Sequence, residues 1–407
     1  MRWLSTSVFL LLCLAVPASS WSQAPDVQKF LMDGRLADGS AAIVKHLDAN
    51  PDDDRARFGL GVTQFLQAYE HVGQSLYRYG LRTERSFVEP HPEIRELWPQ
   101  NPKPEKIDYA AARKIVQTFV DDMNRAEATL AEVKDERVKL PLHVARIKID
   151  FFGLERPVNA GFLFQLFGQG DFIIAFDRGD VAWLRGYCHF LAAFGEVLLA
   201  VDSQPLFECT AHLLFEDVET PHTFLIEDRE PFVENFWRNP RVLSDIIATI
   251  HLLLRFPVKE PDRLKVAHGH LLSMCQMSRE MWTHFSAETD DDNEWIPNSK
   301  QRGVLGVPVT ADMIKTWLAT VAEAELVLEG KRLVPFWRGT QADRGINLKR
   351  VFYEPTDIDI LLWVQGTAAT PYLEKGPLTK FIEPEMIGRI DRQFGGMNFI
   401  RFVFWFN

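Results

Sequence analysis

Apolar residues recur at steps of three and four along most of this chain, which is the spacing of one face of an α-helix. The clearest case follows Asp108, where apolar positions between 112 and 126 form one stripe and charged residues occupy the opposite face. Further stripes cover 180–198, 205–217, 240–254 and 261–287. The last three begin at a proline, a residue favoured in the first turn of a helix. The pattern predicts a mainly α-helical fold of antiparallel helices joined by short loops.

The N-terminal part carries a helical run at 41–47, a turn at Asn50-Pro51 and two more helical runs from 55 to 79. Small and aromatic residues here have the spacing of one helical hairpin repeat: Leu60, Gly61, Gly73, Tyr77 and Gly80. This spacing resembles the tetratricopeptide repeat family. Arg57, Gln64 and Arg85 stand where that family has Trp, Tyr and Pro. The resemblance implies tetratricopeptide-like helical hairpins, packed on the helical bundle that follows.

Proline-rich and acidic stretches divide the chain into expected segments. Five prolines lie between 90 and 104 and forbid regular structure there. Thr289 to Pro308 is a second stretch with little periodicity. We therefore expect a tetratricopeptide-like segment at 25–88, a connector at 89–107, a central helical domain at 108–288, a connector at 289–309 and a C-terminal module at 310–407.

The C-terminal module is expected to begin with a helix from Thr310 to Glu329 and to continue as an irregular part of low strand content. Four short signatures mark this part: Leu328-Glu329-Gly330-Lys331, Pro335-Phe336-Trp337-Arg338, Gly345-Ile346-Asn347-Leu348 and Pro371-Tyr372-Leu373-Glu374. They resemble a family of exported bacterial proteins, and the resemblance implies export without implying any chemistry. The aromatic stretch Phe399–Asn407 is predicted to dock into the core, with an anchor for a partner or lipid as the alternative.

The first 24 residues have the features of a secretory signal peptide. Arg2 precedes an apolar run at 8–16, and small residues follow from Ala18. The run is far shorter than the roughly 20 residues that span a bilayer. We expect cleavage between Ala18 and Ala24, a periplasmic or extracellular location, and no transmembrane span in the mature chain.

The charge composition of the chain argues against some classes of binding partner. The net charge of −11 and the mixing of acidic with basic residues argue against nucleic acid and against binding an anionic membrane by charge alone. We expect instead another envelope or secreted protein as partner. Three cysteines remain after the signal, Cys188, Cys209 and Cys275, and we expect them to be unpaired, with a Cys188–Cys209 bridge as the alternative.

No short catalytic motif of the common hydrolase, zinc or phosphate-binding classes is present. Carboxylate pairs that cleave glycosides need no fixed spacing, so a hydrolase with an acidic site stays open. His212 and Glu216 lie one helical turn apart and are weak candidates for a base and its orienting partner. A surface polar contact is the favoured interpretation of this pair.

One stripe on the 261–287 helix combines imidazoles and thioethers: His270, Met274, Met277, Met281 and His284. Such ligands suit Cu(I), so copper handling in the periplasm is a third hypothesis. At a rise of ~1.5 Å per residue the two histidines are about 21 Å apart and cannot share one ion. Core packing of the methionines is therefore favoured, and no metal or other cofactor is expected.

A calcium loop is a further weak possibility at Asp290, Asp292 and Glu294. Trp295 stands where such a loop requires glycine, and Gln301 stands where it requires the closing glutamate. The sequence thus favours an exported binding or scaffolding protein, with a secreted hydrolase as the main alternative. Ligand, partner and oligomeric state are not encoded in any motif of the chain.

Overall fold

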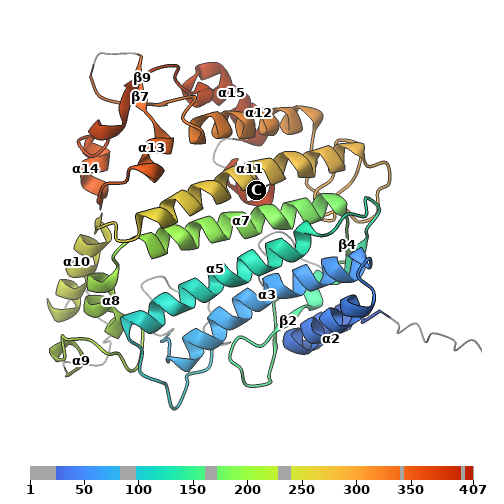
Figure 1. Ribbon diagram of the computed structural model, residues 1–407, viewed down its shortest axis with the longest axis horizontal. Helices are drawn as coiled ribbons and strands as arrows, with labels where there is room; N and C mark the ends of the chain where they lie inside the picture. Colours follow the sequence, from blue (N-terminus) through green and yellow to red (C-terminus); the bar gives the residue numbers. More distant parts are fainter. Residues whose placement is uncertain are drawn as a thin grey trace, which may run out of the picture.

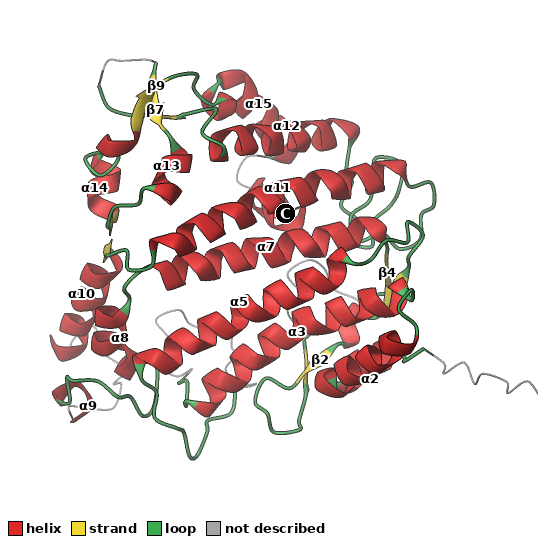
Figure 2. Ribbon diagram, in the orientation of Figure 1, coloured by secondary structure: helices red, strands yellow, loops and turns green. Residues whose placement is uncertain are grey.

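The computed structural model describes residues 24–82, 98–160, 172–227, 240–339, 343–395 and 399–406. These residues form a mainly α-helical fold with a few very short strands, as the apolar stripes predict (Figure 2). The signal region 1–23 lies outside the described residues, so its predicted role stays a prediction.

Long helices lie side by side and form the body of the molecule (Figure 1). They are α3 (Asp54–Arg78), α5 (Tyr109–Ala131), α7 (Arg178–Ala200), α11 (Pro261–Ala287) and α12 (Ala311–Leu328). Each packs against the next in that order, and α7 with α11 forms the most extensive pair. Side chains of Asp108 and Thr310 accept hydrogen bonds from backbone N–H groups at the start of α5 and α12, so each of these residues is the N-cap of its helix.

The N-terminal helices α1 (Val27–Asp33) and α2 (Leu36–Ala49) pack on α3. Asp53 caps α3, and its other oxygen lies 2.8 Å from Nε2 of His46 on α2. One continuous hydrophobic core runs from Val27 through the long helices to Phe406. The predicted segments 25–88 and 108–288 therefore bury their apolar faces against each other.

Short antiparallel strand pairs close the ends of the helical layer. The strands are β1 (Leu140–Leu142) with β4 (Ile174–Phe176), β2 (Lys148–Ile149) with β3 (Val158–Asn159), β5 (Arg255–Phe256) with β8 (Ile358–Asp359), and the sheet β6-β7-β9 (Val334–Pro335, Arg344–Ile346, Leu373–Lys375). Strand β2 lies where apolar Ile147, Ile149 and Phe151 alternate with Lys148 and Asp150, a pattern typical of a strand. Pairing of β1 with β4 brings residues 140–142 directly to the beginning of α7.

The remaining helices are short and lie mostly toward the ends of the long ones. They are α8 (Gln204–Thr210), α9 (Phe224–Glu227), α10 (Pro240–Leu253), α13 (Leu348–Tyr353), α14 (Ile360–Gln365), α15 (Pro384–Phe394) and α16 (Phe399–Phe406). The helix expected over 205–217 was predicted too long, because α8 ends at Thr210 and a 3₁₀ turn follows. The C-terminal module is more helical than predicted, since α13 and α14 lie in the part that was expected to be irregular.

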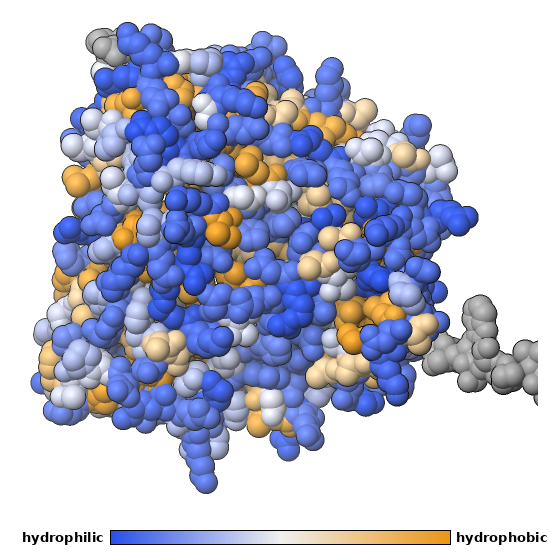
Figure 3. Space-filling view, in the orientation of Figure 1, coloured by the Kyte–Doolittle hydropathy of each residue, from blue (hydrophilic) through white to orange (hydrophobic). Residues whose placement is uncertain are grey.

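The C-terminal aromatic stretch docks into the core, as predicted: Trp405 and Phe406 of α16 are buried against Trp282 and Trp317. Cys188, Cys209 and Cys275 are all free, so the described part of the chain has no disulfide among them. Among the described residues, every helix is too short or too polar to cross a bilayer. The face shown in Figure 3 is mostly hydrophilic, with hydrophobic residues scattered over it.

Candidate functional site

Three carboxyl groups from separate parts of the chain meet where α7 begins and α11 ends. Asp177 precedes α7, Glu288 directly follows α11, and Glu294 lies in the stretch that leads on to α12. One oxygen atom from each residue lies within 4.8 Å of the other two. We call Asp177, Glu288 and Glu294 the carboxylate site. It is the one group of three or more His, Cys, Asp or Glu ligands with this spacing within the described ranges.

Helix capping fixes the position of Asp177. Its carboxylate accepts hydrogen bonds from the backbone N–H groups of Gly179 (2.8 Å) and Asp180 (3.4 Å). In return, the Asp180 carboxyl accepts the backbone N–H of Asp177 at 3.0 Å, which completes a capping box. The side chain of Asp177 also forms a hydrogen bond with the side chain of Glu288. The capping box therefore holds the Asp177 carboxylate rigidly at the site.

Burial and mutual repulsion keep these groups protonated above their usual pH range. Burial raises the pKa of Glu288 to about 9, and the neighbouring Asp177 charge adds to the shift. Burial, assisted by the charges of Asp177 and Asp290, raises the pKa of Glu294 to about 7. The pKa of Asp177 is also raised, chiefly by burial. At neutral pH the carboxylate site thus holds at least one proton, carried between Glu288 and Asp177.

An open groove of about 550 Å³ gives access to two members of the site. Asp177 and Glu288 line it together with several charged residues, among them Glu136, Lys139, Arg178, His284 and Asp290. The Lys139 ammonium bridges the side chains of Asp290 and Asp292, the latter at 2.9 Å. Lys139 therefore offsets part of the negative charge of the acidic loop.

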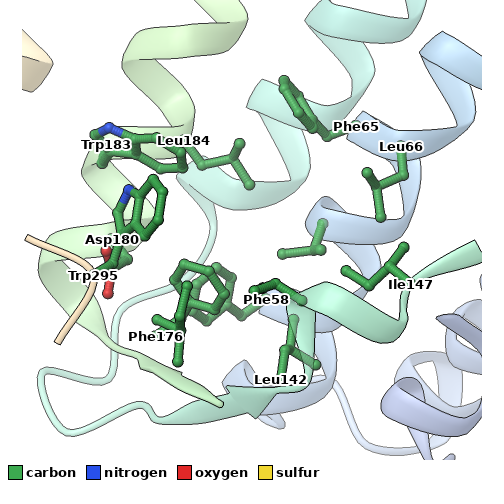
Figure 4. A pocket seen from close by; sticks show the side chains of 13 residues that line it. Phe58, Phe65, Leu66, Leu142, Ile147, Phe176, Asp180, Trp183, Leu184 and Trp295 are labelled. Atoms are coloured by element: carbon green, nitrogen blue, oxygen red, sulfur yellow. The ribbon is translucent and has the colours of Figure 1, made fainter. Parts of the chain in front are cut away.

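An apolar cavity of about 90 Å³ lies elsewhere in the core, with Asp180 and Trp295 among its lining residues. Figure 4 shows its walls, formed by α3, β1, the start of α7 and Trp295. The labelled lining residues are Phe58, Phe65, Leu66, Leu142, Ile147, Phe176, Asp180, Trp183, Leu184 and Trp295. Asp180 is the single ionisable residue among the residues that line the cavity.

The structure gives His212 and Glu216 separate partners. Nε2 of His212 lies 3.4 Å from the Asp245 carboxylate on α10, whereas Glu216 forms an ion pair with Arg82. His212 is buried and Glu216 is half-buried. The structure therefore pairs His212 with Asp245 and Glu216 with Arg82, and the two residues are not brought together as a base and its orienting carboxylate.

The methionine and histidine stripe on α11 is dispersed over several surroundings. Met277 and Met281 are buried in the core, and Met274 packs against it while partly exposed. His270 faces His189 of α7 with their Nδ1 atoms 3.0 Å apart, and His284 lies 3.3 Å from Glu136. The two histidines of the stripe thus face different partners, and two of the three thioethers fill the core.

Two members of the carboxylate site, Asp177 and Glu288, had no signal in the apolar pattern. Glu294 was one of three residues of the weakly predicted calcium loop, together with Asp290 and Asp292. In the structure it groups instead with Asp177 and Glu288, which come from other parts of the chain. The sequence signal that was available is the Asp-x-x-Asp spacing of 177 and 180 at the start of a long stripe, which is typical of an acidic helix cap.

Comparisons with protein-family models, with curated proteins and with solved structures give no match to this chain. The tetratricopeptide and exported-family resemblances therefore stay predictions, but the two helical runs expected from 55 to 79 were wrong in one respect, because they form the single helix α3. The function has to be argued from the geometry and charge of the site itself.

Proposed function

We propose that this protein is an exported binding protein of the cell envelope whose carboxylate site holds a divalent cation, with Ca²⁺ as the best fit. The observation that carries the proposal is the convergence of three carboxylate oxygens within 4.8 Å of one another. Ca²⁺ binds oxygen ligands at about 2.3–2.6 Å, so ligands on opposite sides of the ion lie at most about 5 Å apart. The carboxylate site meets this limit.

Charge supports the same assignment. Burial is the main cause of the raised pKa values of Glu288 and Glu294, and repulsion among the neighbouring carboxyls adds to it. A dication would replace the protons on Glu288 and Glu294 and satisfy all three groups at once. Ca²⁺ accepts irregular oxygen geometry and high coordination numbers, whereas Mg²⁺ requires a near-ideal octahedron, so Ca²⁺ is the preferred ion.

Export supplies a compartment in which such a site is useful. The predicted signal at the N-terminus would place the mature chain in the periplasm or outside the cell. Extracellular calcium sites commonly bind with Kd values of about 10⁻⁴–10⁻³ M, and we expect this range here. Mass spectrometry of the envelope protein tests export separately: the N-terminus should fall between Ala18 and Ala24, and an intact Met1 would contradict it.

Calcium removal and addition test the cation directly. After EDTA treatment and dialysis, millimolar Ca²⁺ should raise the melting temperature of the wild-type protein, because the ion binds only the folded site. Glu288→Gln and Glu294→Gln should each lose most of this shift. Glu136→Gln is the matched control, since Glu136 lines the same groove outside the carboxylate site. Equal shifts in all four proteins would refute the proposal.

A secreted hydrolase is the second candidate, because Glu288 and Asp177 share a hydrogen bond in an accessible groove. Two carboxyls that share one proton provide an acid and a base at neighbouring positions. A panel of glycoside and peptide substrates distinguishes the two functions. Metal-independent turnover that Glu288→Gln abolishes, together with no calcium response, would favour the hydrolase over the binding protein.

A further inference from the structure

A groove of about 430 Å³ lies at the end of α7 that is remote from the carboxylate site. Its walls come from the beginning of α5, the end of α7, α8, and the strands β5 and β8; α8 and α10 lie beside these helix ends in Figure 1. We call it the apolar groove, because most of its lining is apolar, including Val116, Leu198, Leu206, Phe207, Leu253 and Phe256. Leu198 is roughly 30 Å from Asp177 along α7, so the two sites are separate.

The apolar groove lies where the packing of the protein is discontinuous. Val116 and Leu199 on its walls pack with the main hydrophobic core, whereas Ala211 and Phe215 belong to a separate, smaller cluster. Three large apolar side chains of the groove are also exposed: Leu198 is 43% exposed, Leu214 37% and Leu253 44%. Apolar walls that face water across such a groove are unfavourable unless a ligand covers them.

One part of the lining is polar. It consists of three partly exposed residues, Tyr109, Arg113 and Ser203. The Tyr109 hydroxyl oxygen lies 3.3 Å from Oγ of Ser203 and 3.5 Å from Nη1 of Arg113. Arg113 is the single charged residue among those that line the groove, and its side chain is 24% exposed. The groove therefore combines an apolar length with one accessible cationic end group.

The hydrogen bonds of Arg113 leave donor capacity on the guanidinium group. Its Nη2 atom donates to the Leu199 carbonyl at 3.0 Å and to the Glu260 carboxylate. Glu260 is shared with Arg263, whose Nε atom donates to its other oxygen at 2.6 Å. The Nη1 atom has only the long contact with Tyr109. An Nη1 donor next to a hydroxyl donor suits a ligand carboxylate.

We propose that the apolar groove binds a fatty acid, whose carboxylate pairs with Arg113 and the hydroxyl groups of Tyr109 and Ser203, and whose hydrocarbon chain covers the apolar walls. Charge complementarity decides the head group, because the one charged group of the lining is a cation. A concave site of a few hundred Å³ with an apolar lining and few polar groups is typical of small-molecule binding.

The volume of the groove sets the chain length. An apolar cavity of about 150 Å³ holds benzene, so about 430 Å³ corresponds to roughly 17 non-hydrogen atoms. A saturated fatty acid of about 14 carbons is of this size. Up to that length, each methylene group that becomes buried should strengthen binding about fourfold.

Isothermal titration of the mature protein with two matched amphiphiles tests the inference. The probes are dodecanoate and dodecylammonium, which have the same chain and opposite head charges. Titration in EDTA prevents calcium soaps and keeps the test independent of the carboxylate site. We expect one dodecanoate per chain and at least tenfold weaker binding of dodecylammonium, the factor that one charged hydrogen bond supplies.

Two pairs of variants in α5 complete the test. Arg113→Gln should weaken dodecanoate binding about tenfold without weakening dodecylammonium binding, whereas Lys114→Gln, at an exposed neighbour outside the groove, should change neither. Ala112→Phe places a ring in the groove and should abolish binding of both probes. Ala110→Phe is its control, because Ala110 is exposed and does not line the groove. Thermal melts verify that each variant is folded.

Three results would overturn the proposal. They are absence of dodecanoate binding below its micelle concentration, equal affinity for the two probes, and equal dodecanoate affinity in Ala112→Phe and Ala110→Phe. Sedimentation of the wild-type protein covers another occupant: a concentration-dependent dimer that Ala112→Phe disrupts and dodecanoate leaves intact would assign the groove to a second copy of the chain. Calcium binding at the carboxylate site is unaffected by any of these outcomes.

Discussion

The stability of the metal-free protein should fall as the pH rises from 6 to 8, and Glu288→Gln should remove much of this dependence. The Glu288 side chain is neutral in the folded state up to a pKa of about 9, whereas in the unfolded chain it ionises near 4.5. Between these values the folded state binds one more proton than the unfolded state. The contribution of Glu288 to the free energy of unfolding is therefore fully present below pH 4.5 and is lost as the pH rises toward 9.

One proton corresponds to about 1.4 kcal/mol per pH unit as an upper limit. Glu288 is only half-buried, so solvent screening reduces the effect to about 0.5 kcal/mol per pH unit. Wild type should thus lose about 1 kcal/mol more than Glu288→Gln between pH 6 and 8. Glutamine cannot ionise and retains a donor toward Asp177. Titrating groups away from the site are common to both proteins and cancel in the difference, so the difference reports the ionisation of Glu288 together with its coupling to Asp177 and Glu294.

Urea denaturation in EDTA at pH 6, 7 and 8 measures this difference. The two curves of unfolding free energy against pH should diverge, with wild type the steeper. Saturating Ca²⁺ should flatten the wild-type curve, because the ion replaces the proton whose loss causes the slope. Parallel curves in EDTA would show that Glu288 ionises normally in the folded state, and would refute the electrostatic account of the site.

Other predictions concern packing and a buried ion pair. Gly179→Ala should destabilise by about 1–3 kcal/mol, since the new Cβ would lie 2.3 Å from the Phe285 ring. Gly269→Ala in α11, where nothing lies within 4 Å, should instead stabilise by about 0.5–1 kcal/mol; thermal melts compare the two. His71 lies 2.7 Å from the buried Asp122, whose hydrogen bond raises the histidine pKa. NMR titration should place this pKa above 6.5 and find it lowered in Asp122→Asn; an unchanged value would contradict the pairing.

The long helices were predictable because each buries one face and exposes another, so the apolar period survives in the sequence. The N-caps at Asp108 and Thr310 were predictable for a local reason, since a cap needs only a polar side chain before the stripe. Helix α16 was harder to predict. Arg401 is the single polar residue between Phe399 and Phe406, and spacing alone does not distinguish a helix from a strand in so short an apolar run.

The carboxylate site was not predictable from spacing. Asp177 and Glu288 are more than a hundred residues apart, and they meet only because α7 and α11 pack along their full lengths with opposite ends aligned. The sequence pattern predicts each helix but not which ends adjoin. For the stripe on α11, core packing was the favoured interpretation, and Met277 and Met281 are buried in the core as expected.

The most direct test of the carboxylate site is isothermal titration of Ca²⁺ into the metal-free mature protein at pH 7, in two buffers of different ionisation enthalpy. The account predicts one ion per chain and a release of about one to two protons, because Glu288 is protonated and Glu294 is about half-protonated at this pH. The release should fall in Glu288→Gln. Absence of binding at millimolar Ca²⁺, or binding without proton release, would contradict the assignment of Asp177, Glu288 and Glu294 as a cation site.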